Sequence, residues 1–429
     1  MRPEKPESGY AVAAAPDPTR DRGSHRGRGQ KEPPMNKIGQ VRKFLQKQFP
    51  LERWKDGMTD ERKRPQIPVG TIAQAIIEMV PRGQTSLLEV DQDVREPEFR
   101  AWHGSDREMV VSDSTLERSL SGFGLPPIRD ALWEMAQIVS KRPGMRMALP
   151  SGRKVRLGIL DGSVWGRFHG SVLALTGKRT TIVAGYEMSA GRGHELAASR
   201  KVLTEARKEL GRGFVDLVVE DGLYLTAADF RWSVETGGFH MVVKTSEESL
   251  TVIQDARELF FGNPGEMNAS LERAQGIDVV RGIEYEIISA AGFRWGNLPY
   301  PLKVAWVRER LLKPKSGHPT ETTFWVLTTD ETLKAEDMRE VAHQRWQIEN
   351  NVFRRLSALV DSKRRLTADA HVREALLGLW FLGFNLFGVF MAWTRIEFRH
   401  PLYRTAKVTW KWLTRSLARD TWRAVDVRT

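Results

Sequence analysis

Apolar residues in the first third of the chain recur three and four positions apart, which is the period of an amphipathic helix. Two stretches show this period: Ile72, Ala73, Ile76, Ile77 and Val80, and then Ile128, Ala131, Leu132, Met135 and Val139. Ser114 and Glu117 have the spacing of a capping box, which predicts the start of a further helix. We therefore expect residues 36–150 to be helical.

Two of these short predicted helices are separated by GFGLPP, residues 122–127. Such a pair of helices is either an ordinary packing unit or a helix-turn-helix that binds DNA, and the pattern fits both. With the basic charge described below, we interpret residues 36–150 as a helical N-terminal DNA-binding region.

From residue 155 the hydrophobic pattern changes to short runs rich in β-formers, in the order three strands, helix, strand, helix, strand. The predicted strands are VRLGILD, SVLAL, TTIVAGYEM, FVDLVVED and HMVVK, and the predicted helices are HELAASRKVLTEARKEL and TAADFRW. This order predicts an α/β fold with helices against a mixed sheet, whose first part covers residues 151–245. Asp161 and Asp221 are each expected to close a strand.

The segment 246–330 is predicted to be a β-rich insertion, with strand candidates in IDVVRGIEYEIISA, LKVAWVRER and TTFWVLTT. A long helix is then expected from near Lys334, carrying EDMREVAHQRWQIENNVFRRLSALV. Residues 331–394 are therefore expected to form the second part of the α/β core.

Twenty residues without a charge, from Ala375 to Thr394, are long enough to cross a bilayer. A helix that is apolar on all sides either spans a membrane or is buried in a protein core. Arg373 and Arg395 flank the stretch, Asn385 lies in its middle, and no second candidate follows, so we expect a core helix. A membrane-anchored protein remains an alternative.

The net charge of +12 over 429 residues favours a polyanionic partner such as nucleic acid. Half of this surplus lies in residues 395–429, where nine basic residues stand against three acidic ones. This segment is predicted to form a basic C-terminal helix, in which Lys407, Lys411, Arg415, Arg419 and Arg423 lie four apart.

The chain has no cysteine, which excludes disulfides, thiolate nucleophiles, zinc fingers and iron–sulfur ligation. Its nine histidines show no two-histidine zinc spacing, so a metal site made of carboxylates is expected, and such a site suits Mg²⁺ or Mn²⁺. Residues 1–35 are rich in proline and arginine and are predicted to be a disordered basic tail, with Met35 as an alternative start. No secretory signal is visible, so a cytoplasmic location is expected.

The stretch RWQIENNVFRRL, residues 345–356, places Arg345 one helical turn before Glu349. Arginine before glutamate is the weaker order for a helix ion pair, so helix stability alone explains the arrangement poorly. Asp161 and Asp221 lie at strand ends, where open α/β sheets bind ligands, and Glu349 is expected on a helix beside them. Three such carboxylates could bind two magnesium ions that promote cleavage of a phosphodiester. The guanidinium of Arg345 could bind the phosphate.

These motifs resemble the DDE transposases of the insertion-sequence-four group, over about residues 156–387. The signature of that group is tyrosine, two residues, arginine, three residues, glutamate, six residues and lysine, and Arg345 and Glu349 match it. LDGS resembles the first aspartate region and EDGLY the second, which implies Asp161, Asp221 and Glu349 as the catalytic and metal-binding triad. The resemblance implies an RNase H-like core with a β insertion, Mg²⁺ with Mn²⁺ as a substitute, and cut-and-paste transposition.

The sequence departs from that signature at two positions, because Ala342 replaces the tyrosine and Leu356 replaces the lysine. Arg354 and Arg355 are near enough to supply the missing charge as DNA-binding residues, although Phe353 and Leu356 are expected on the face of Glu349.

The resemblance also implies that Trp325 stacks on a base flipped out of the element end, with Trp295 and Trp306 as lesser candidates. The implied partners are double-stranded DNA, at the element ends and at the target, and a second copy of the chain in a DNA-bound homodimer. A catalytically inactive, transposase-derived DNA-binding protein remains the alternative function.

Overall fold

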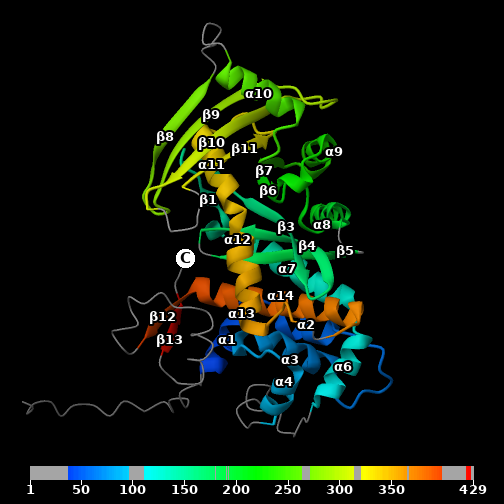
Figure 1. Cartoon of the computed structure of the whole chain (residues 1–429). Helices are drawn as coiled ribbons and strands as arrows, with labels where there is room; N and C mark the ends of the chain where they lie inside the picture. The colour runs from blue at the N-terminus through cyan, green and yellow to red at the C-terminus, as the bar shows by residue number, and fades with distance from the viewer. Residues whose placement is uncertain are drawn as a thin grey trace, which may run out of the picture. The chain divides into compact units, whose positions relative to one another are not determined.

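The computed structural model describes residues 37–95, 111–178, 180–189, 191, 193–262, 271–313, 320–364, 367–398 and 422–426. All of these residues belong to one compact unit, Lys37–Thr429. The tail predicted for residues 1–35 lies outside the described residues. Within the unit, a group of helices precedes a large mixed sheet, and a long helical segment then returns past that sheet (Figure 1).

The N-terminal region is helical, as its apolar period predicts. Four of the five residues of the first predicted face are buried and Ile77 is half-buried, while all five of the second face are buried. The helices described are α1 (Lys37–Gln48), α2 (Leu51–Gly57), α3 (Val69–Arg82), α4 (Leu87–Asp93), α6 (Asp113–Ser121) and α7 (Leu125–Ser140).

The predicted capping box at Ser114 is wrong by two residues. Helix α6 begins at Asp113, and the side chain of Ser112 accepts a hydrogen bond of 3.2 Å from the backbone N–H of Thr115. Ser114 therefore lies in the first turn of the helix, where its hydroxyl cannot act as the N-cap. Glu117 is exposed on the same helix.

The α/β layer follows in the predicted order, and its strands belong to one nine-stranded sheet of order β5-β4-β3-β6-β7-β11-β10-β9-β8. Strands β3, β6 and β7 are parallel to one another, and the remaining neighbours are antiparallel. The first part of this layer consists of β3 (Leu157–Trp165), β4 (Phe168–Thr176), β5 (Thr181–Ser189), α8 (Glu195–Leu210), β6 (Leu217–Asp221), α9 (Ala227–Trp232) and β7 (His240–Thr245).

The segment expected to be a β-rich insertion continues the same sheet, because β11 (Glu321–Thr328) pairs with β7. It also contains a helix that the pattern did not predict, α10 (Thr251–Phe261). The remaining strands are β8 (Glu272–Asp278), β9 (Ile283–Phe293) and β10 (Leu302–Leu311).

The run IDVVRGIEYEIISA is not a single strand, which corrects the prediction. A turn separates the end of β8 from the start of β9, and in it Gly282 adopts a φ of 67°. Glycine reaches this left-handed conformation without the strain that a side chain causes. The apolar residues Val279 and Val280 are exposed in this turn, which is why the run resembles a continuous strand.

The long helix predicted from near Lys334 forms, but its hydrogen bonding changes along its length. It consists of α11 (Ala335–Gln344), α12 (Trp346–Ile348), the π-helical segment η5 (Glu349–Phe353) and α13 (Arg354–Val360). In Figure 1 these segments run end to end past β3 toward α14 (Ala370–Trp393).

Helix α14 is a buried core helix, as expected. It is the one helix in the described residues that is long and apolar enough to cross a membrane, and 89% of its most apolar window is buried inside the structure. It packs against α3, α7 and β5. The polar Asn385 within it is fully buried and forms two hydrogen bonds with Val183 of β5, each 2.7 Å long.

The predicted basic C-terminal helix does not extend over the whole of residues 395–429. The segment begins with β12 (Thr394–Phe398), which pairs antiparallel with β13 (Trp422–Asp426). Arg423 of the predicted basic stripe therefore lies on a strand, opposite Glu397. Lys407, Lys411, Arg415 and Arg419 lie outside the described residues.

Candidate active site

The pairing of β3 with β6 places Asp161 and Asp221 at the same level of the sheet. The last paired residues of these two parallel strands are Ile159 and Val219, and each aspartate follows two residues later. Because alternate residues of a strand share a face, the two carboxylates lie on the same face, just beyond the last pair. The order of the strands thus brings together two residues that are far apart in the sequence.

Asp161 does not close its strand, which corrects one detail of the prediction. Strand β3 continues to Trp165 because it stays paired with β4, although its pairing with β6 has already ended. Asp221, in contrast, is the last residue of β6, as predicted. Asp161 therefore lies just beyond the point where the pairing of β3 with β6 ends.

Arg345 joins the two aspartates. Its Nη1 atom lies 3.2 Å from Oδ2 of Asp161 and 3.3 Å from Oδ2 of Asp221. The other oxygen of each carboxylate accepts a hydrogen bond from the N–H of the following glycine, at 2.9 Å from Gly162 and 2.7 Å from Gly222. The guanidinium is mostly buried and also lies over the ring of Trp346, 4.7 Å from its centroid.

Gly222 is required by close packing at this point. A Cβ atom built on it would lie 2.7 Å from Oγ1 and 3.0 Å from Cβ of Thr245 on the neighbouring strand β7. A larger residue would push apart the strands that position Asp221. The glycine of EDGLY therefore has a structural reason independent of any resemblance.

Glu349 is the first residue of the π-helical segment, and this changes which residues share its face. In a π-helix the backbone hydrogen bonds join residues five apart, and here the N–H of Arg354 donates to the C=O of Glu349. The Nη2 atom of Arg354 lies 3.3 Å from Oε1 of Glu349. The prediction that Phe353 and Leu356, rather than an arginine, share the face of Glu349 is wrong for this reason, and both are buried.

The three acidic residues influence one another electrostatically. Burial raises the pKa of Asp161 to about 6; Arg345 and the N–H of Gly162 oppose this shift, whereas the charges of Asp221 and Glu349 add to it. Glu349 follows Arg345, which contacts both aspartates, by four residues on the same helical segment.

The family model described as Transposase DDE domain matches residues 158–386 of the chain, which is more than half of it. The chain belongs to this family. The match begins within β3 and ends within α14, so it includes Asp161, Asp221, Arg345 and Glu349. The mixed sheet with flanking helices agrees with the RNase H-like fold of DDE transposases. A search of curated proteins found no match.

The chemistry of the site fits a divalent cation. Asp161, Asp221 and Glu349 offer hard carboxylate oxygens, the ligands that Mg²⁺ and Mn²⁺ prefer. In the part of the chain that the structure describes, no three Asp, Glu or His side chains are close enough to hold an ion as they stand. Instead, the guanidinium of Arg345 occupies the position of a counterion between the aspartates, and its buried Nε atom has no hydrogen-bond partner among the described residues.

The raised pKa of Asp161 predicts a dependence of stability on pH. Its ordinary pKa is 3.8, so the folded DDE domain binds this proton more tightly than the unfolded chain does, and the charged form costs stability above about pH 6. We expect Asp161→Asn to raise the free energy of unfolding at about pH 8 by up to about 3 kcal/mol, with little difference at about pH 4. Urea denaturation at the two pH values measures this, and an effect of equal size at both would contradict it.

Two residues at this site were not singled out from the sequence. Lys244 ends the run HMVVK, lies opposite Asp221 in the register of β6 and β7, and places its Nζ atom 3.8 Å from the ring centroid of Phe324. Burial lowers the pKa of Lys244, while Glu309 and Asp221 oppose that shift. Trp346, next to Arg345, is 41% exposed. For Lys244 the sequence did offer a signal, because this lysine ends the predicted strand that follows EDGLY.

The expectation that Trp325 offers a face to a flipped base is wrong for the structure described. Trp325 is 2% exposed and stacks on Phe260, with 6.1 Å between ring centroids. A ring enclosed on both faces has no surface on which a base can stack. Trp295 and Trp306 are half-buried and each packs edge-on against a phenylalanine.

Proposed function

We propose that the chain is a transposase that cleaves DNA phosphodiesters at the ends of a transposable element and joins the freed 3′-hydroxyl to target DNA. The observation that carries this proposal is the meeting of Asp161 and Asp221 at the guanidinium of Arg345, on the helical segment that also carries Glu349. These residues come from two strands and a helix that are far apart in sequence. The family match supports the same conclusion.

In this proposal Asp161, Asp221 and Glu349 hold Mg²⁺, for which Mn²⁺ substitutes. The bound ions would supply activation of the attacking water or 3′-hydroxyl and stabilisation of the leaving oxygen. Arg345 neutralises the two aspartates when they have no other cation, and a guanidinium released from them by bound metal would suit a phosphate oxygen. Arg354 restrains Glu349 by their ion pair and presents a cation next to the reacting phosphate.

The transposase group, the partners and the location of the protein are part of the same proposal. The spacing of Arg345 and Glu349 supports the insertion-sequence-four group, and double-stranded DNA is the proposed partner at the element ends and at the target. Synapsis of two ends suggests a DNA-bound homodimer. A cytoplasmic location is part of the same proposal, and the burial of α14 inside the protein argues against a membrane-spanning role for that helix.

The proposal is tested by incubating the purified protein with DNA that carries the flanking ends of its element, with and without Mg²⁺ or Mn²⁺. We expect strand breaks at the element ends only when one of these ions is present. Binding without cleavage under both ions would instead support a catalytically inactive DNA-binding protein. Recovery of the protein only in detergent extracts would support the membrane-anchored alternative.

Arg345→Lys is expected to slow cleavage by roughly thirtyfold, because lysine keeps the charge and loses the planar fork. A hydrogen bond to a charged group contributes about 2 kcal/mol, which corresponds to that change in rate. Arg308→Lys is a matched control, since Arg308 is an exposed residue of β10 that forms an ion pair with Glu286 of β9. Equal rates for the Arg345 variant and the control would remove Arg345 from the reaction.

A further inference from the structure

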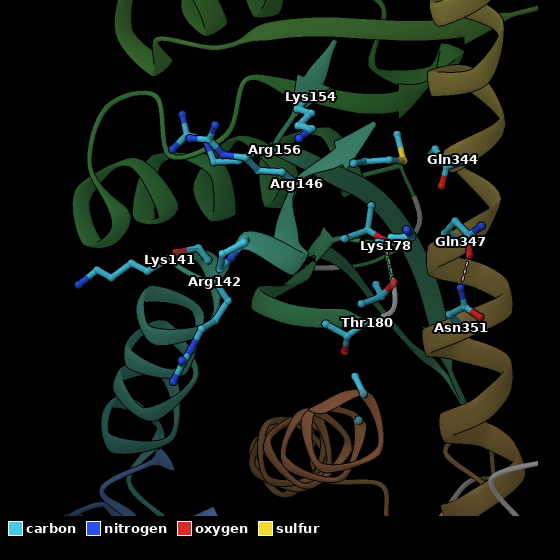
Figure 2. Close-up of a pocket in the computed structure, with 18 of the residues that line it drawn as sticks. Lys141, Arg142, Arg146, Lys154, Arg156, Lys178, Thr180, Gln344, Gln347 and Asn351 are labelled. Atoms are coloured by element: carbon cyan, nitrogen blue, oxygen red, sulfur yellow. Dashed lines mark hydrogen bonds between the residues drawn. The ribbon is translucent and has the colours of Figure 1, made fainter. Parts of the chain in front are cut away.

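A large basic cavity lies beside the helix that carries Glu349. It has a volume of about 1270 Å³ and is bordered by the end of α7, the β1–β2 hairpin (Met147–Ala148 and Lys154–Val155), the turn between β4 and β5, the α11–α13 helix and the end of α14. Figure 2 shows the labelled side chains around it, with Lys154, Arg156 and Lys178 on the sheet side and Gln347 on the helix.

The side chains that line this cavity carry charge of one sign. Among the described residues seven lysines and arginines border it, and no aspartate or glutamate does. Asp216 neutralises one of them, because its carboxylate lies 2.8 Å from the guanidinium of Arg156. Five others are exposed and form no ion pair with any described residue: Lys141, Arg142, Arg146, Lys154 and Lys178. Arg142 donates a hydrogen bond to Gln48 and lies over the ring of Trp393, and both contacts leave its charge uncompensated. Such a concentration of cations attracts a polyanion.

The cavity is separate from the carboxylates. Arg156 precedes β3 and Asp161 lies five residues further on, so the rise of a strand puts their backbones about 16 Å apart. On the helix, Gln344, Gln347 and Asn351 face the cavity, and they lie round the helix from Glu349. One helix therefore borders both places.

We propose that this cavity is a second nucleic-acid site, which holds the phosphodiester backbone of a DNA strand away from the reacting bond. Its volume exceeds the 300 to roughly 1,000 Å³ that small-molecule pockets usually have, and its cations come from several separate elements. Amide and hydroxyl groups such as Gln347 and Thr180 add neutral donors for phosphate oxygens. The site recognises the backbone and not the bases. This inference rests on the proposed function, because it takes DNA to be the substrate.

The test uses two double variants. The cavity variant carries Lys154→Ala and Lys178→Ala, and the control variant carries Lys313→Ala and Lys334→Ala, at two exposed lysines that do not line the cavity. Binding of a fluorescein-labelled duplex carrying the element end is measured by anisotropy over a range of salt. Because each phosphate contact contributes about 0.9 to the slope of log K against log salt, we expect the cavity variant to lose about 1.8 and to bind about tenfold more weakly. The control variant is expected to keep the wild-type slope.

Three outcomes would overturn the inference. The first is a cavity variant whose slope of log K against log salt equals that of the wild-type protein. If the wild-type protein still binds and cuts DNA, this outcome would leave the proposed function intact. The second is an equal loss in the control variant. The third is full displacement of DNA by inorganic phosphate at an equal concentration of phosphate groups, which would indicate a site for a small anion. A wild-type protein that fails to bind DNA would instead reject the proposed function as well.

Discussion

Replacing Glu349 by glutamine is expected to slow DNA strand cleavage by roughly a thousandfold or more and to leave the fold intact. The amide keeps the size of the side chain but provides no charge for a divalent cation, and the stabilisation that such an ion supplies is worth several kcal/mol. A loss of about 4 kcal/mol corresponds to a thousandfold change in rate. The side chain of Glu349 is 36% exposed and Arg354 is its ion-pair partner, so little folding energy depends on it.

Glu340→Gln on the same helix is the matched control. Glu340 pairs with Arg281 of the β8–β9 turn, a partner outside the group formed by the two aspartates and Arg345. We expect this variant to cleave DNA at nearly the wild-type rate. Comparable cleavage by wild-type protein and by Glu349→Gln, measured in single turnover with Mg²⁺, would remove Glu349 from the reaction.

Replacing Asn385 by alanine is expected to lower the free energy of unfolding by about 4 kcal/mol, because alanine leaves two buried backbone groups unpaired at roughly 1 to 3 kcal/mol each. Strand β5 is an edge of the sheet, and Val183 lies next to the irregularity where its pairing with β4 shifts. Asn385 accepts from the N–H of Val183 and donates to its C=O, so α14 takes the place of a neighbouring strand.

Asn385→Leu separates the hydrogen bonds from the packing. Leucine restores the volume and suits the apolar neighbours of α14, but it forms neither hydrogen bond, so this variant is also expected to be destabilised. Urea denaturation of the two variants and the wild-type protein measures the difference. Wild-type stability of the leucine variant would show that packing, and not backbone pairing, determines the role of this position.

The hydrophobic period predicted most of the elements because burial imposes it directly. The alternating strands around Asp161 and Asp221, the helix bearing Glu349 and the core helix around Asn385 all follow from patterns within a few residues. The meeting of the two aspartates was also predictable, since parallel strands of one sheet bring their corresponding positions together.

What the sequence did not reveal depends on contacts between distant segments or on small changes in backbone geometry. Strand β3 passes Asp161 because β4 continues to pair with it, and one π-helical segment brings Arg354 to Glu349. Trp325 has the composition of a stacking residue, but Phe260 of the unpredicted helix α10 covers it. The basic cavity draws its cations from segments that no local pattern connects.

The proposed chemistry depends above all on Asp161, Asp221 and Glu349 forming one divalent-cation site. Ferrous iron placed in such a site, with ascorbate and peroxide, produces hydroxyl radicals that cut the nearby backbone, and mass spectrometry locates the cuts. We expect cuts near all three residues, which Mg²⁺ suppresses and which Asp221→Asn abolishes. Cuts that fall elsewhere, or that persist unchanged in excess Mg²⁺, would contradict the shared site.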